Sequence, residues 1–169
     1  ARLRKNDEVT SRLGDLNKRF MALVTSTDPH RRGYELESIL RDLFVLFDLD
    51  AKASFKVEGD QVDGAFVFES TDYLLEARWR AAAADANDLD GLAGKLQRRL
   101  DNTLGLFISM NGYSEGAITA HSGMGRRTII LMAGADLVAV LEGHLTLPAL
   151  LGRKRRHAAQ TGQIFLSAT

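Results

Sequence analysis

The segment 59–80 constrains the fold more than any other, because it predicts two adjacent β-strands with charged residues among apolar ones. Residues 61–68 and 73–80 are rich in aromatic and branched side chains, and the polar residues 69–72 between them are typical of a turn. We therefore predict a β-hairpin at the centre of the fold.

Three charged side chains of this hairpin are expected on one face, since side chains alternate between faces along a strand. If the turn is even-numbered and Phe68 pairs with Tyr73, Asp63 lies opposite Arg78. Glu76 then lies two residues nearer the turn, on the same face. Two carboxylates and a cation on a partly apolar face are costly unless they are paired or bind a ligand. This indicates either a binding site or a buried ion-pair cluster.

The 169 residues are 45% hydrophobic and 26% charged, which suits one globular domain with a sizeable core. Acidic and basic residues balance to a net charge of zero, so only local basic clusters could bind an acidic partner. The absence of cysteine excludes disulfides and thiolate metal sites and favours a cytoplasmic location. The apolar stretch 128–151 is too interrupted for a membrane span. Because the sequence begins at Ala1 rather than at methionine, we expect other domains of a longer chain.

Two amphipathic helices are predicted before the hairpin, from apolar residues at helical spacing within 9–24 and 36–47. The second begins after Asp28, where a capping side chain precedes a proline. The first helix either packs on the core or pairs with a second copy, and we favour packing. Glu37 lies at the edge of the second helix's apolar stripe, either as a surface residue or turned towards a site.

The remaining elements alternate between strands and helices. We predict an edge strand at 53–57, helices at 89–102, 115–122, 136–142 and from 146, buried strands at 104–110 and 128–132, and a last strand at 163–166. Antiparallel strands followed by a helical crossover into a buried strand predict an α/β fold, with a mixed sheet flanked by helices in the order αβββαβ.

Asp63 in Gln-Val-Asp-Gly, followed by Glu76-Ala77-Arg78 on the next strand, resembles the signature of the PD-(D/E)xK nuclease superfamily. The resemblance covers about 32–165. Similarity to the Mrr-like restriction endonuclease branch lies in Gly33-Tyr34-Glu35-Leu36-Glu37, Leu43-Phe44, Gly105-Leu106-Phe107-Ile108-Ser109 and Gly112-Tyr113-Ser114. It implies a restriction-endonuclease-like nuclease domain at 29–169, preceded by an N-terminal amphipathic helix at 1–28.

The resemblance also implies a DNA endonuclease that depends on Mg²⁺ or Mn²⁺, as the effector of a bacterial restriction or defence protein. Asp63, Glu76 and the backbone carbonyl of Ala77 would bind the metal, and Glu37 would assist. A divalent cation generates hydroxide near neutral pH and stabilises the charge of the displacement. Magnesium takes a few carboxylates, keeps several waters and accepts phosphate oxygens. Because cutting both strands needs two sites, we expect a homodimer.

Arg78 stands where the family usually has a lysine near the attacking water and the scissile phosphate. Arginine keeps the positive charge and can grip phosphate with two donors, but it does not release its proton. Three interpretations stay open: an active natural variant, a degenerate site that only binds DNA, or an engineered change. The alternatives to a nuclease are a silent DNA-binding or assembly module on the same fold, and a scaffold whose first helix self-associates through Leu16 and Phe20.

Other residues are candidates for contact with nucleic acid, whose phosphates are bound mainly by basic and polar groups. They are Gln61, Lys95, Arg99, Arg126, Arg127, Lys154 and Arg155. For Gln61, a plain strand-end role is an equal alternative, and for the run 153–156 a solvated helix face is the default. Trp79 is predicted to lie in the core. The four histidines show no metal-ligand spacing.

Overall fold

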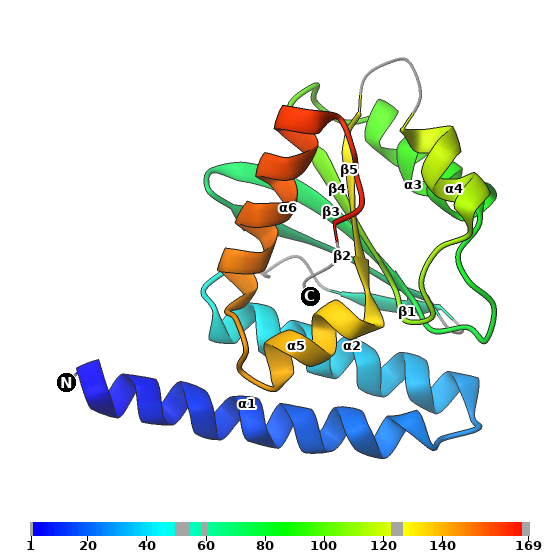
Figure 1. The fold of residues 1–169 in the computed structure, drawn as a ribbon. Coiled ribbons are helices and arrows are strands. Elements are labelled where there is room, and N and C mark those ends of the chain that lie inside the picture. The colour runs from blue at the N-terminus through cyan, green and yellow to red at the C-terminus, as the bar shows by residue number, and fades with distance from the viewer. Residues whose placement is uncertain (1, 50–54, 59–60, 123–126, 167–169) are drawn as a thin grey trace.

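The computed structural model describes residues 2–49, 55–58, 61–122 and 127–166 (Figure 1). The described elements, in chain order, are α1 (Arg2–Val24), α2 (Pro29–Leu46), β1 (Lys56–Glu58), β2 (Gln61–Phe68), β3 (Thr71–Arg78), α3 (Ala86–Gln97), β4 (Leu104–Ser109), α4 (Glu115–His121), β5 (Ile129–Ala133), α5 (Gly134–Leu141) and α6 (Leu147–Thr161). The predicted α/β class, with a mixed sheet flanked by helices, is confirmed.

The five strands form one sheet in the order β1-β2-β3-β4-β5. The pairs β1–β2 and β2–β3 are antiparallel, whereas β3–β4 and β4–β5 are parallel, because α3 and α4 carry the chain back across the sheet before β4 and β5. The predicted last strand at 163–166 is reduced to a single bridge between Phe165 and Leu131 of β5. The edge strand lies slightly later than predicted, and residues 53 and 54 of that prediction lie outside the described residues.

The turn between β2 and β3 is shorter than predicted. Phe68 pairs with Thr71, which leaves only Glu69 and Ser70 in the turn. Both turn residues have positive φ, 48° and 61°. A two-residue turn of this kind matches the right-handed twist of the flanking strands, and this is why it joins hairpins more readily than a four-residue polar loop.

The short turn changes the register of the hairpin by two residues. Asp63 lies opposite Glu76, and Gln61 lies opposite Arg78. The predicted pairing of Asp63 with Arg78 was therefore wrong. The prediction that these side chains share a face is confirmed, because an even shift leaves every side chain on its original face.

Helices cover both faces of the sheet (Figure 1). Leu89, Leu92 and Leu96 of α3 pack with α4 on one face. On the other face, α2, α5 and α6 pack on a larger core that contains Val62 and Phe66 of β2. Since side chains alternate along β2, Gln61 and Asp63 point to the α3 face.

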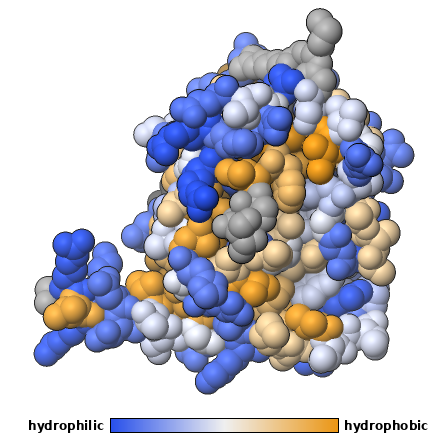
Figure 2. Space-filling view, in the orientation of Figure 1, coloured by the Kyte–Doolittle hydropathy of each residue, from blue (hydrophilic) through white to orange (hydrophobic). Residues whose placement is uncertain are grey.

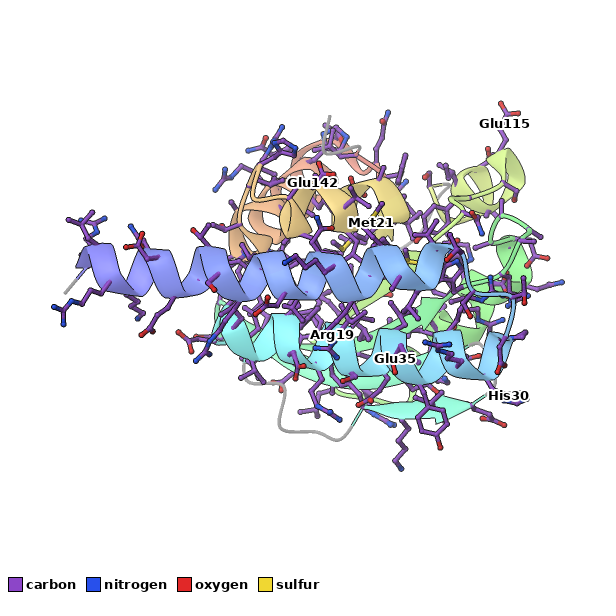
Figure 3. The ribbon with its side chains drawn as sticks, turned by 90° about the horizontal axis from the view of Figure 1, so that it is seen from below. Arg19, Met21, His30, Glu35, Glu115 and Glu142 are labelled. Carbon is purple, nitrogen blue, oxygen red and sulfur yellow. The ribbon has the colours of Figure 1, made fainter. Side chains whose placement is uncertain are left out.

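The first helix packs along α2 and α5 (Figure 3). Its buried residues are Leu13, Leu16, Phe20 and Leu23. Between the two helices Arg19 donates to Asp42 of α2 at 2.8 Å and to Ser38 at 2.7 Å. The prediction that this helix packs on the core is confirmed. Self-association through Leu16 and Phe20 is not available, because these side chains are already buried.

Trp79 is 8% exposed and stacks on Phe20 with ring centroids 5.3 Å apart, as expected of a core residue. The first turns of α1 project beyond the body of the molecule and carry mostly hydrophilic side chains (Figure 2). Within the described part of the chain, no helix combines the length and apolar character that a membrane span requires.

Candidate active site

Two carboxylates face each other on adjacent strands of the sheet. Asp63 of β2 and Glu76 of β3 are direct cross-strand partners. The ammonium of Lys95, on α3, lies 3.0 Å from Glu76 Oε1 and 3.5 Å from Asp63 Oδ1. The amide of Gln61 donates to the same two oxygens, at 3.2 and 2.9 Å. One ammonium and one amide therefore hold the two carboxylates together.

The two carboxylates differ in burial. Glu76 is 1% exposed, whereas the side chain of Asp63 is 37% exposed. Burial raises the pKa of Glu76 above its ordinary value, and the hydrogen bond and charge of Lys95 offset only part of this effect. The site thus keeps a buried carboxylate whose charge is incompletely compensated.

Lys95 stays protonated in this position. Burial acts to lower the pKa of Lys95, but the hydrogen bond and charge of Glu76, with those of Asp63, outweigh it and raise that pKa. A positive charge therefore stands between the two carboxylates.

Arg78 is held at the other side of Glu76. Its Nη1 donates to Asp88 Oδ1 at 2.7 Å, and its Nε lies 3.5 Å from Glu76 Oε2. Arg80 Nη2 shares the same oxygen of Asp88 at 2.7 Å. The second oxygen of Asp88 accepts from the backbone of Asp85 in a capping box that starts α3. The guanidinium of Arg78 is thus tied to the beginning of α3.

The close approach of α3 to the sheet positions Lys95. Leu92 and Leu96 pack over Gly105 of β4, where a Cβ would approach Leu96 Cδ1 to 2.8 Å and Leu92 Cδ2 to 3.1 Å. Glycine lets the helix sit low on the sheet. Lys95, between the two leucines in sequence, reaches the carboxylates from there.

A cavity of about 410 Å³ opens beside the carboxylates. Its charged lining residues are Lys56, Asp63, Lys95 and Arg99. Lys56 of β1 is the cross-strand partner of Asp63. The open side of the site is therefore lined by three cations around one exposed carboxylate, which suits an anionic chain such as a phosphate backbone.

The site fits a divalent cation. The Lys95 ammonium already stands within 3.5 Å of both carboxylates, at a place where a cation is favoured. Carboxylate oxygens are the ligands that Mg²⁺ prefers. The described residues contain no group of three or more His, Cys, Asp or Glu able to hold a metal. A cation held by Asp63 and Glu76 would therefore complete its shell with backbone, water or phosphate oxygens.

Glu37, predicted to assist at the site, lies elsewhere. It is on α2, which packs on the opposite face of the sheet, and is 8% exposed. Its carboxylate accepts from Arg41, one turn along the same helix, at 2.6 Å. The structure therefore does not bring Glu37 into contact with Asp63 or Glu76.

Lys154 is buried, so its predicted contact with nucleic acid was wrong. Its side chain is 1% exposed, and Nζ lies 3.1 Å from Asp136 Oδ2. The same ammonium donates to the carbonyl of Leu166 and lies 5.3 Å from the centre of the Phe165 ring. Lys154 is a structural residue that joins α6 to the start of α5.

The other predicted basic residues are dispersed. Arg155 pairs with Glu69 and lies over the Phe68 ring, so it supports the β2–β3 turn. Arg99 lines the cavity beside the carboxylates and also a second one of about 310 Å³, together with Arg127. Arg126 lies outside the described residues. Of the three that the structure describes, Arg99 alone lines the cavity of the site.

Sequence reasoning missed three members of the site. Asp85 and Asp88, three residues apart before an apolar helix, are a helix-start signal that could have placed the capping box. The link from Asp88 to Arg78 and Arg80 had no such signal, because it depends on how α3 docks. Lys56 beside Asp63 could not be found without the register of β1.

No protein-family model and no curated protein matches the chain. Two solved structures are similar to it, both 14% identical over 91% of this chain. One is the DNA modification-dependent restriction endonuclease AspBHI, with a TM-score of 0.47. The other is the MspJI restriction endonuclease in complex with a 27-mer oligonucleotide, with a TM-score of 0.41. The chain spans 40% and 35% of those two chains.

Proposed function

We propose that this chain is a DNA endonuclease domain of restriction-endonuclease-like fold that depends on Mg²⁺ or Mn²⁺. The observation that carries the proposal is Asp63 facing Glu76 across β2 and β3, with the Lys95 ammonium within 3.5 Å of both carboxylates. Two carboxylates with a cation between them, beside an open basic cavity, match the needs of phosphodiester hydrolysis.

In this proposal Asp63, Glu76 and the backbone carbonyl of Ala77 hold the metal. When bound, a divalent cation lowers the pKa of water and neutralises charge at the phosphate. In the overall reaction a water oxygen bonds to phosphorus, the bond from phosphorus to the leaving sugar oxygen breaks, and that oxygen gains a proton. The Gln61 amide orients the two carboxylates towards each other.

The basic cavity supports a nucleic acid as the substrate. Lys56 and Arg99 line it together with Asp63, and such residues position a phosphate backbone without reading sequence. Within the proposal the domain is the effector of a bacterial restriction or defence protein, beside other domains of a longer chain. It acts as a homodimer, because two strands need two sites.

The test is nicking of a supercoiled plasmid with Mg²⁺, with Mn²⁺ and with chelator. We expect cleavage with metal only. Asp63→Asn should abolish it without changing the circular dichroism spectrum, since this side chain is partly exposed. The matched control is Asp72→Asn, an exposed aspartate at the other end of the hairpin, which should cut as the wild type does. Failure of the wild type with both metals, or full activity of Asp63→Asn, would refute the proposal.

A second candidate is a silent DNA-binding or assembly module. The observation that favours it is that Lys95 and Gln61 already donate to one oxygen of each carboxylate, while Arg78 is fixed to Asp88. Such a module would shift DNA on a gel equally with metal and with chelator. Binding would weaken steeply with salt, because it would rest on phosphate contacts.

A further inference from the structure

We propose that Lys95, rather than Arg78, supplies the positive charge that stabilises the reacting phosphate, while Arg78 positions Glu76. The inference rests on the proposed nuclease function and assigns the two cations of that site to different tasks. It follows from the contacts of each cation, its exposure and its freedom to move.

The guanidinium of Arg78 is held by contacts with two carboxylates of the protein. Its Nη1 donates to Asp88 at 2.7 Å and its Nε lies against Glu76 Oε2 at 3.5 Å. Asp88 is itself held by the capping box with Asp85 and by Arg80. Moving the guanidinium to a phosphate would leave the nearly buried Asp88, 9% exposed, without one of its cations. Arg78 is thus suited to stabilise the buried Oε2 of Glu76 by its charge.

Lys95 lies on the open side of the site. Its side chain is 39% exposed, against 22% for Arg78, and it lines the cavity beside the carboxylates. Its ammonium ends a flexible, unbranched side chain of four carbons. Rotation about the bonds of this side chain can therefore move the ammonium without moving α3. Of the two cations, only Lys95 combines contact with both carboxylates and access to the cavity.

Lys95 cannot stay between the carboxylates when they hold a divalent cation. Two positive charges at one place repel each other strongly in a partly buried site. The ammonium would then turn into the cavity, whose lining includes two further cations, Lys56 and Arg99. A charge arriving beside the phosphate in this way stabilises the negative charge that develops on its oxygens.

This assignment makes an unusual prediction about Lys95→Met. The variant should bind Mn²⁺ several-fold more tightly than the wild type, because no ammonium competes for the carboxylates. It should nevertheless cleave DNA about 100-fold more slowly, the order of effect expected on losing one charge-stabilising donor. Arg78→Met should show the reverse in metal binding, which weakens because Glu76 loses its support.

The experiment measures Mn²⁺ affinity by calorimetry without DNA, and single-turnover cleavage at saturating Mn²⁺ and DNA. Lys95→Gln is the second variant, in case the methionine disturbs folding, and Lys95→Arg should keep most of the cleavage because it keeps the charge. The matched control is Lys18→Met, an exposed lysine of α1, which should leave both quantities unchanged.

The possible results separate the two proposals. A wild type that cleaves nothing refutes the nuclease function, whereas a wild type that cleaves while Lys95→Met cleaves equally well refutes the inference alone. Mn²⁺ binding by Lys95→Met that is unchanged or weaker also overturns it, even without cleavage data. An Arg78→Met protein that binds Mn²⁺ normally but cleaves about 100-fold more slowly would assign the charge to Arg78 instead.

Discussion

Asp63 and Glu76 are direct partners across β2 and β3, but they differ in burial. Glu76 is buried between Lys95 and Arg78, whereas Asp63 opens onto a basic cavity. One carboxylate is thus fixed by the protein, and the other is accessible from solvent. In the proposed nuclease, this asymmetry would hold a cation firmly on one side and leave it open to a substrate on the other.

Replacing Glu76 by glutamine should stabilise the metal-free protein at neutral pH. Burial raises the pKa of Glu76 in the folded state, so the folded protein retains a proton that the unfolded chain has already lost. Stability therefore falls as pH rises from the ordinary value through the raised one, and the cost persists at neutral pH. The glutamine of Glu76→Gln cannot ionise, so this variant avoids the free-energy cost of a buried charge.

The predicted stabilisation by Glu76→Gln can be checked by thermal unfolding in the presence of chelator, monitored by circular dichroism. The melting temperature of Glu76→Gln should exceed that of the wild type at pH 7.5, and the difference should shrink towards pH 4. A less stable variant at pH 7.5 would mean that the ion pairs of Glu76 with Lys95 and Arg78 outweigh the cost of burial.

Removing Lys154 should damage stability and leave DNA binding unchanged. Lys154→Met leaves Asp136, 1% exposed, without this ion pair, which should cost about 3–5 kcal/mol of the free energy of unfolding. Urea denaturation measures this, with the exposed Arg156→Met as the control, expected within about 0.5 kcal/mol of the wild type. If Lys154→Met instead weakened DNA binding in a stable protein, the structural role would be refuted.

Two glycine substitutions should have opposite effects. Gly105→Ala forces Leu96 and Leu92 of α3 away from β4 and should cost about 1–3 kcal/mol. It should also slow cleavage, since α3 carries Lys95. Gly91→Ala, on an open face of the same helix, meets no atom within 4 Å and should stabilise by about 0.5–1 kcal/mol. Similar melting temperatures for the two variants would contradict this view of how α3 docks.

Substitutions in the cavity should change how DNA binding depends on salt. Lys56→Ala and Arg99→Ala each remove one cation from the cavity lining. If each contacts one phosphate, the slope of log affinity against log salt should fall by about one per residue. Fluorescence anisotropy with a labelled duplex, in Ca²⁺ to prevent cleavage, measures the slopes. Slopes equal to that of the wild type would place the DNA path elsewhere.

Much of the fold could be predicted because it depends on local patterns. Helical spacing of apolar residues predicted α1 and α2, and runs of branched and aromatic residues predicted β2, β3 and β4. The prediction that Asp63 and Glu76 share a face followed from the alternation of side chains along strands. It holds for any turn with an even number of residues.

Other features could not be predicted, since they depend on contacts between distant segments. The two-residue turn set which residues pair, and the docking of α3 brought Lys95 to the carboxylates. The basic run 153–156 was expected by default to be a solvated helix face, yet the helix turns Lys154 into the core while Arg153 and Arg156 stay exposed. Sequence spacing cannot distinguish a buried basic side chain from an exposed one when all four side chains carry the same charge.

Nearly all the helices and strands, and the pair of acidic residues on one face of a hairpin, could be inferred from the amino-acid sequence, because both follow from the short-range geometry of the backbone. Which cation lies between those acids, and which one is tied to the start of α3, depends on the packing of the whole chain. This is so because charges far apart in the chain meet only once the sheet and its helices have packed.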